Sequence, residues 1–313
     1  MVRETVVTTA DLVWPVFVHA GKENQEIASM PGVVRYSLDH LVAACEGAAQ
    51  LGMPAVAIFP SIDPGLKDAT GSHGVSPENL LYRAVRAVKA SCPDLLVMTD
   101  VALDPYTDHG HDGLLNAGRT SVDNDSTVEV LCRLAVMEAD SGADFVAPSD
   151  MMDGRIQAIR QALDSAGHAN VGIIAYSAKY ASALYGPFRD AVGSVQGKQA
   201  ISKADYQMDP ANVREALMEA RLDEIEGADV VMVKPASYYL DVIRSVRETC
   251  GVPVAAYQVS GEFAQIHAAA RLGWLDYEST RDESLLAIKR SGADMIWTYF
   301  AREVAEKLAG GAI

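Results

Sequence analysis

Short apolar runs alternate with helical patterns along the whole chain. Eight of these runs predict strands, at residues 12–18, 55–59, 95–101, 145–147, 171–175, 230–233, 254–258 and 295–299. Continuous apolar runs without polar alternation are typical of parallel strands that are buried on both faces. A helical pattern follows each run, which predicts a (β/α)8 TIM barrel in one domain spanning residues 1–313. A doubly wound open sheet is the alternative, although no G-x-G-x-x-G follows the first strand.

Local signals set the expected helix boundaries. Ser37 suits the N-cap of a helix that runs to Gly52. Pro77 is expected at the first position of the helix 77–91, and Gly186-Pro187 is expected to end a helix begun at Tyr180. Further helices are predicted at 125–141, 154–165, 210–226, 238–248, 262–272, 279–291 and 302–309. Gly-Ala-Asp recurs at 142–144, 227–229 and 292–294, where the glycine suits the left-handed position that ends a helix.

Two of the apolar runs end in a lysine. Lys234 follows the run 230–233, and Lys179 lies just beyond the run 171–175. Burial lowers the pKa of a lysine, and two neighbouring ammonium groups lower each other's pKa. A neutral amine can condense with a ketone to form a Schiff base. The alternative for a single lysine is that its ammonium reaches solvent as the strand emerges.

Composition narrows the class of protein. The 313 residues are 49% hydrophobic and 22% charged, and the formal net charge is −16. Such an acidic chain is not expected to bind nucleic acid or anionic membranes, although a few cations can still attract an anionic small molecule. Four scattered cysteines without a C-x-x-C pair indicate a reduced, cytoplasmic protein. Neither a signal peptide nor a run as long as a membrane span is found in the sequence.

Chemically useful side chains fall at the predicted strand ends, where barrel active sites form. They are Asp100, Ser149, Asp150, Lys179, Lys234, Tyr257, Ser260 and Tyr299. In such a set the amines act as nucleophiles, the aspartates move protons, and the hydroxyls hold a carboxylate. Taken singly, each aspartate could be a turn residue, but together they mark one rim of the barrel.

Several motifs in order resemble the porphobilinogen synthase (5-aminolaevulinate dehydratase) family. They are Ser-Met-Pro-Gly-Val (29–33), Thr-Asp-Val-Ala-Leu-Asp-Pro-Tyr (99–106), Pro-Ser-Asp-Met-Met-Asp-Gly-Arg (148–155), Tyr-Ser-Ala-Lys-Tyr (176–180), Tyr-Gly-Pro-Phe-Arg (185–189), Tyr-Gln-Met (206–208), Met-Val-Lys-Pro (232–235) and Tyr-Gln-Val-Ser-Gly-Glu (257–262). The resemblance covers nearly the whole chain. It implies a TIM barrel that condenses two 5-aminolaevulinate molecules to porphobilinogen with loss of two waters, in tetrapyrrole synthesis and without an organic cofactor.

The resemblance also implies residue roles. Lys234 and Lys179 would each form a Schiff base with one substrate, with Asp100 and Asp150 as acids beside them. The first substrate's carboxylate would be held by Ser260 and Tyr299, and the second's by Arg189 and Gln207. Residues 193–209 correspond to an active-site lid that excludes water. Glu219 matches a glutamate that holds an allosteric magnesium ion at a subunit interface, so a homo-oligomer is expected.

The chain departs from the family pattern at three places. Lys203 aligns with the second carboxylate-binding arginine, so looser binding geometry is expected. Zinc-using members carry three cysteines where this chain has Ala102, Asp104 and Asp112, so zinc is not expected. The two aspartates would hold a hard cation or share a proton without a metal. The arm that precedes the barrel is expected to be short.

Two other functions stay open from the sequence alone. A class I aldolase would use a single Schiff-base lysine in the same kind of barrel. A non-catalytic barrel that binds small anions would form no covalent adduct with its ligand.

Overall fold

The computed structural model describes residues 2–193 and 201–310. Within these residues eight parallel strands form a closed barrel, and β10 pairs back onto β1. In barrel order the strands are β1 (Leu12–His19), β4 (Ala55–Ser61), β5 (Leu96–Val101), β6 (Phe145–Pro148), β7 (Gly172–Lys179), β8 (Val230–Lys234), β9 (Val254–Gln258) and β10 (Met295–Thr298). Each corresponds to one predicted strand. The predicted (β/α)8 barrel is therefore confirmed.

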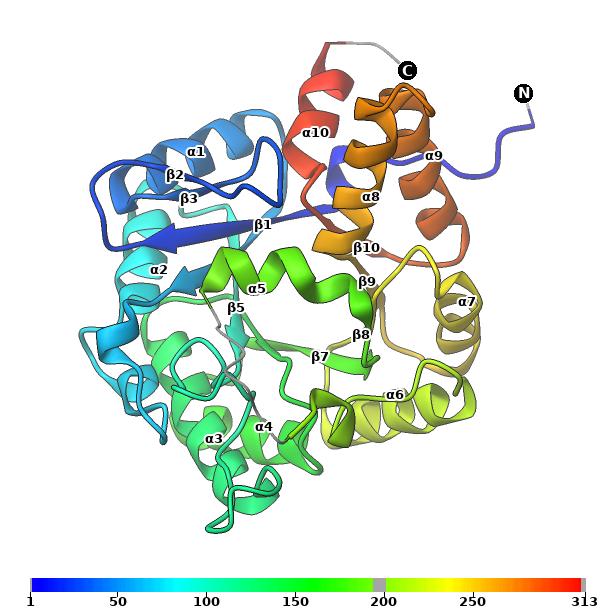
Figure 1. Cartoon of the computed structure of the whole chain (residues 1–313). Helices are drawn as coiled ribbons and strands as arrows, with labels where there is room; N and C mark the ends of the chain where they lie inside the picture. Colours follow the sequence, from blue (N-terminus) through cyan, green and yellow to red (C-terminus); the bar gives the residue numbers. More distant parts are fainter. Residues whose placement is uncertain (1, 194–200, 311–313) are drawn as a thin grey trace.

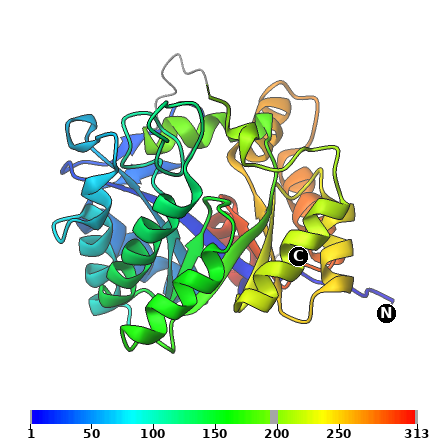
Figure 2. The same ribbon diagram turned by 90° about the horizontal axis from the view of Figure 1, so that it is seen from below.

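Helices surround the strands on the outside of the barrel (Figures 1 and 2). They are α1 (Leu38–Gln50), α2 (Leu80–Ser91), α3 (Asn124–Asp140), α4 (Arg155–Ser165), α6 (Arg214–Glu226), α7 (Leu240–Thr249), α8 (Ser260–Arg271), α9 (Tyr277–Arg290) and α10 (Ala301–Ala309). The short helix α5 (Gly186–Val192) differs, because it lies across one end of the barrel (Figure 2). It follows β7 after a short 3-10 helix (Ala183–Tyr185), so this end is the carboxyl end of the strands, where a barrel builds its active site.

The repeated Gly-Ala-Asp sequence joins helices to strands in one way. Gly142, Gly227 and Gly292 have positive φ angles of 101°, 108° and 114°, which confirms the predicted left-handed helix ends. Each following aspartate then accepts a hydrogen bond from the backbone N–H at the start of a neighbouring strand. The three bonds run from Val97 to Asp144 (2.7 Å), from Ile173 to Asp229 (2.8 Å) and from Val254 to Asp294 (2.9 Å). These aspartates thus fix the start of one strand against the next.

Ser37 is the N-cap residue of α1, as predicted, although its side chain contacts His40 and does not cap the helix. Two other local predictions differ from the structure. Pro77 precedes α2, and Asn79 caps that helix by accepting a hydrogen bond from Leu81 N. Gly186-Pro187 begins a helix and does not end one, because proline is tolerated in the first turn, where its missing N–H leaves no bond unmade.

A small hairpin that the sequence did not predict holds the end of α5. The hairpin pairs β2 (Gln25–Glu26) with β3 (Val34–Tyr36), and β3 extends the sheet beside β1. Arg35 in β3 donates from Nε to Ala191 O at 2.6 Å. A second cation, Lys67 from the loop after β4, donates to Gly193 O at 2.9 Å. These two cations satisfy carbonyls at the carboxyl end of α5, where a helix leaves carbonyl groups unbonded.

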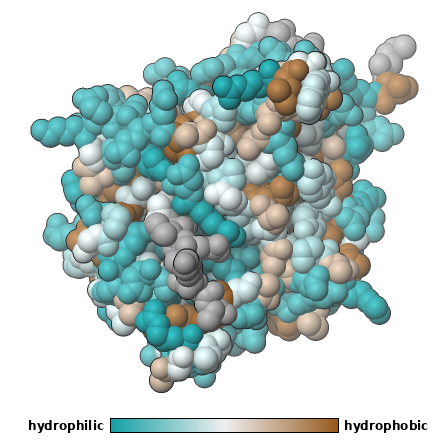
Figure 3. Space-filling model, viewed as in Figure 1, coloured by the Kyte–Doolittle hydropathy of each residue, from teal (hydrophilic) through white to brown (hydrophobic). Residues whose placement is uncertain are grey.

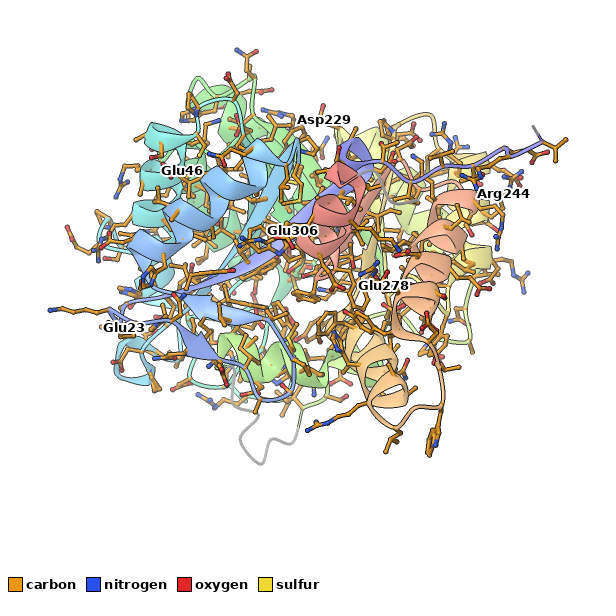
Figure 4. All side chains as sticks on the ribbon, turned by 90° about the horizontal axis from the view of Figure 1, so that it is seen from above. Glu23, Glu46, Asp229, Arg244, Glu278 and Glu306 are labelled. Atoms are coloured by element: carbon orange, nitrogen blue, oxygen red, sulfur yellow. The ribbon has the colours of Figure 1, made fainter. Side chains whose placement is uncertain are left out.

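Charged residues gather on the outer layer of the molecule. Figure 4 shows the side chains of Glu46, Glu278 and Glu306 on the outer helices α1, α9 and α10. Hydrophilic residues also lie near the centre of the face that carries α5 (Figure 3). In the part of the chain that the structure describes, no helix combines the length and the hydropathy that crossing a membrane requires.

Candidate active site

The two predicted lysines meet at the carboxyl end of the barrel. Lys179 and Lys234 are the last residues of β7 and β8, and they are paired in the strand register. Both are buried, with 5% and 7% of their surface exposed. Aromatic rings surround the Lys234 ammonium, with ring centres 4.6 Å away for Tyr257 and 4.9 Å for Tyr176. Tyr185 and Phe188 each lie 5.3 Å from it.

This environment favours a neutral Lys234. Burial, followed by the positive charge of Lys179, lowers the pKa of Lys234 from 10.5 to about 7. Lys179 has polar partners that Lys234 lacks, since its ammonium donates to the carbonyl of Ser149 and lies 3.4 Å from Asp112 Oδ1. The site therefore holds one amine in an aromatic pocket and a second one in a polar setting.

The two predicted acids have different surroundings. Burial, and then the charge of Asp104, raise the pKa of Asp100 to about 6. Asp100 lines the same cavity as Lys179. Asp150 is fully buried, and burial also raises its pKa to about 6. Its carboxylate accepts from Met152 N at 2.7 Å and lies 3.5 Å from Arg155 Nε. Asp150 thus contacts the α4 side of the rim and does not line the cavity.

Asp104 and Asp112 converge on Lys203. The Lys203 ammonium lies 2.9 Å from Asp112 Oδ2 and 3.5 Å from Asp104 Oδ2. The Tyr206 hydroxyl donates to the same Asp112 oxygen at 2.7 Å. Burial alone would raise the pKa of Asp112, but the ammonium groups of Lys179 and Lys203 lower it. The hard cation or shared proton expected at these aspartates stays a prediction, and in the structure the Lys203 ammonium lies beside both carboxylates.

The residues predicted to hold the first carboxylate lie beside α5. The Tyr257 and Tyr299 hydroxyls are 2.9 Å apart. Ser260, the first residue of α8, accepts from Phe188 N at 2.9 Å. Gly261 allows this contact, since a Cβ atom there would lie 2.5 Å from the carbonyl oxygen of Leu184. Ser260 is thereby tied to the segment that carries Phe188.

The residues predicted for the second carboxylate come from α5 and the segment after it. Arg189 and Lys203 line the cavity together with Lys179, Asp100, Asp104 and Asp112. Gln207 is buried, and its backbone N–H donates to Lys203 O at 2.9 Å. The cavity between these side chains is small, about 30 Å³. Of the predicted lid, residues 194–200 lie outside the described residues.

Several contacting residues were not assigned a role from the sequence. They are Tyr176, Tyr185 and Phe188 around Lys234, and Tyr206 at Asp112. All four fall inside the family motifs, which is the one sequence signal that could have found them. Their contacts depend on how β7, α5 and the segment near 206 come together, which local patterns do not specify.

The described residues do not fit a zinc site. Residues 2–193 and 201–310 contain no group of three or more His, Cys, Asp or Glu that could hold a metal ion. Cys45, Cys92 and Cys250 are buried and Cys132 is half-buried, all of them free thiols outside the loop 102–124. Burial raises the pKa of Cys45 to about 12 and that of Cys250 to about 11, which disfavours the thiolate that zinc requires.

Glu219 lies apart from the lysines, on α6. It borders a cavity of about 300 Å³ together with Asp153, Asp205 and Glu215. Burial and the neighbouring Asp223 raise the pKa of Glu219. These carboxylates do not come together as a group of three that could hold an ion, so Mg²⁺ there would bind through one carboxylate and several waters.

Comparison with known proteins gives one consistent result. The delta-aminolevulinic acid dehydratase family model matches residues 1–307. The dehydratase of Bradyrhizobium diazoefficiens is 55% identical over 309 residues, covering 98% of this chain and 87% of the relative. That of Chlamydia pneumoniae is 49% identical over 312 residues, covering 99% of this chain and 93% of the relative.

A solved structure agrees with the sequence matches. The dehydratase (porphobilinogen synthase) from Toxoplasma gondii, in complex with the reaction product porphobilinogen, superposes with a TM-score of 0.96. It shares 45% sequence identity, and the match covers 97% of this chain and 86% of that one. The chain therefore belongs to the delta-aminolevulinic acid dehydratase family of hydro-lyases, as its motifs predicted.

Proposed function

We propose that Lys234 and Lys179 carry out the family's reaction by forming Schiff bases with two 5-aminolaevulinate molecules. Each amine attacks a ketone carbon, and a water leaves as the C=N bond forms. The observation that carries this proposal is the pairing of the two lysines in the register of β7 and β8. The pKa of Lys234, about 7, supports it, since a substantial fraction of that amine is neutral near neutral pH.

The two amines are suited to different parts of the reaction. Lys234 lies among aromatic rings, which exclude water from an imine and slow its hydrolysis. Asp100, with a pKa of about 6, can both accept and release a proton near neutral pH. Asp150 is proposed as the second acid, acting beside Ser149, whose carbonyl accepts from Lys179. This chemistry needs no organic cofactor.

The substrate carboxylates are proposed to bind on two sides of the lysines. Ser260 and Tyr299, with Tyr257 bonded to Tyr299, would hold the first carboxylate. Arg189, Lys203 and Gln207 would hold the second. A cavity of about 30 Å³ is too small for two such substrates, so residues 193–209 would act as a lid that moves to admit them.

Reduction with borohydride in the presence of 5-aminolaevulinate tests the covalent step. Mass spectrometry of the parent protein should find the reduced adduct on Lys234. Lys234→Met keeps much of the side-chain volume and removes the amine, so it should fold, lose this adduct and lose activity by on the order of 10³-fold or more. Normal turnover by a folded Lys234→Met protein would refute the proposal. An adduct on Lys179 as well would speak against an aldolase, and no adduct at all would favour a non-catalytic barrel.

We also propose that turnover does not require zinc. The loop 102–124 has no cysteine, and Lys203 already neutralises Asp104 and Asp112. Activity should therefore survive exhaustive treatment with a zinc-selective chelator, with the metal content measured on the same sample. A loss of activity that only stoichiometric zinc restores would contradict this.

A homo-oligomer with an allosteric magnesium ion is proposed from α6. Met218, Leu222 and Ile225 follow one face of this helix and are 56%, 45% and 74% exposed. Large exposed apolar side chains spaced in this way are typical of a surface that another subunit covers. Glu219 lies on the same helix, so an ion bound there would sit beside that surface. A cytoplasmic location is proposed as well, supported by the four free cysteine thiols.

A further inference from the structure

Four charges are concentrated beside the cavity. Asp112 lies between two ammonium groups, with Lys203 Nζ 2.9 Å from one carboxylate oxygen and Lys179 Nζ 3.4 Å from the other. Lys203 also reaches Asp104, at 3.5 Å. The three side chains at this bridge are almost closed to solvent, with 14% of Lys203, 9% of Asp104 and 2% of Asp112 exposed. Within this group two carboxylates balance two ammonium groups, while Asp100 and Arg189 also line the cavity.

We infer that the Lys203 ammonium takes the place of a metal ion between Asp104 and Asp112. Two carboxylates that converge on one point are the usual protein donors for a hard divalent cation. Here that point is occupied by Lys203 Nζ, which is part of the chain. A divalent ion added to the same carboxylates would lie next to two ammonium groups, and this repulsion is strong in a buried site. The bridge therefore excludes divalent cations from the two carboxylates and makes them unnecessary there.

The same ammonium keeps a capacity to bind an anion. A lysine ammonium has three N–H donors, so its two carboxylate neighbours, at 2.9 Å and 3.5 Å, need not use all of them. The third can contact a substrate carboxylate, a step that rests on the proposed function of Lys203. Lys203 would then connect the acid pair to the second substrate without leaving either partner.

The inference is tested by measuring how tightly a variant without the Lys203 ammonium binds a divalent metal ion. In a Glu219→Gln background, which removes the ligand proposed for magnesium on α6, Mn²⁺ binding is measured by equilibrium dialysis and electron paramagnetic resonance. The further change Lys203→Met removes the ammonium and leaves both carboxylates without it. We expect this variant to bind about one additional Mn²⁺ per chain, with affinity tighter by on the order of tenfold or more. Replacing Asp104 with asparagine in that variant should abolish the extra site.

Two control variants test whether any gain in Mn²⁺ binding comes from the Lys203 bridge itself or from the loss of any nearby positive charge. Lys67→Met also removes a half-buried lysine whose charge acts on Asp104, but the Lys67 ammonium donates to Gly193 O. It should leave Mn²⁺ binding unchanged, as should Lys203→Arg, which keeps the positive charge. Equal Mn²⁺ binding by the Lys203→Met protein and its parent would overturn the inference, and so would an equal gain in the Lys67→Met protein. The covalent adduct on Lys234 is measured in a separate experiment. The inference about Lys203 can therefore fail while the proposed Schiff-base function stands, and the reverse is also true.

Discussion

At the scale of single residues, the site buries a lysine where its protonated form is unfavourable. Lys234 is buried among rings and close to a second lysine, and both conditions oppose its protonated form. The same conditions produce the neutral amine that attacks a ketone. Burial of Lys234 therefore lowers the free energy of unfolding while it makes the amine more reactive. The loss of stability can be measured in the protein without substrate.

Lys234→Met is expected to stabilise the fold, and more so at low pH. Below a pH of about 7 the folded and unfolded chains both carry the Lys234 proton, so the folded state bears the full cost of a buried ammonium. Between about 7 and the ordinary value of 10.5 only the unfolded chain keeps the proton, so the stability of the parent rises with pH. The gain in thermal midpoint from Lys234→Met should thus be larger near about pH 6 than near about pH 9.5.

Thermal denaturation of both proteins at the two pH values measures this effect. The control is Lys22→Met, because Lys22 is exposed on a loop and its replacement should change the midpoint little at either pH. A gain from Lys234→Met that is the same at both values would show that lost packing or volume, and not charge, determines the result.

At the scale of elements, what could be predicted followed from periodicity and strand ends. Continuous apolar runs located every barrel strand, and because parallel strands end at one rim, Lys179 and Lys234 could be expected to meet. The glycine of each Gly-Ala-Asp could be assigned, since only its own backbone angle was needed. Such features are local, and local chemistry determines them.

Features that depend on distant segments could not be predicted. The role of Pro187 as a helix start depends on how β7 leads into α5, and the hairpin β2–β3 holds α5 through Arg35. The bridge from Lys203 to Asp104 and Asp112 joins residues about one hundred positions apart. Sequence placed two carboxylates in one loop but gave no sign of which cation they would meet.

Gly261→Ala tests how closely α8 supports the segment before α5. A Cβ at this position would lie 2.5 Å from Leu184 O and 2.7 Å from Leu184 Cα, so the backbone must shift. We expect a loss of about 1–3 kcal/mol in the free energy of unfolding. Activity should fall as well, because the adjacent Ser260 contact to Phe188 N would be displaced.

The matched change for this test is Gly47→Ala. A Cβ at Gly47 meets only the end of the Arg302 side chain, at 4.0 Å, and the residue lies inside the helix α1. That variant should be neutral or stabilised by about 0.4–1 kcal/mol. Chemical denaturation and steady-state assays compare the two, and similar behaviour of both variants would rule out the close approach at Gly261 as the cause.

At the scale of the whole molecule, the active site and the proposed subunit surface are joined by buried ion pairs. Arg155 lies 3.5 Å from Asp150 at the rim and 3.2 Å from Asp223 on α6. Its charge also acts on Glu219. A change in the position of α6 would therefore change the position or the charge environment of Asp150. Assembly of subunits through α6 could in this way alter activity.

Magnesium should shift the assembly of the parent protein toward a larger oligomer, with higher activity, and should not do so in Glu219→Gln. The reason is that Mg²⁺ commonly binds through one carboxylate plus several waters, so loss of this single oxygen ligand can remove the ion. Native mass spectrometry with and without Mg²⁺ measures the distribution, and activity is assayed on the same samples. Glu129→Gln is the control, since Glu129 is exposed on α3, away from α6. Identical oligomer distributions and activities of the parent with and without Mg²⁺ would leave Glu219 as an ordinary solvated residue of the helix.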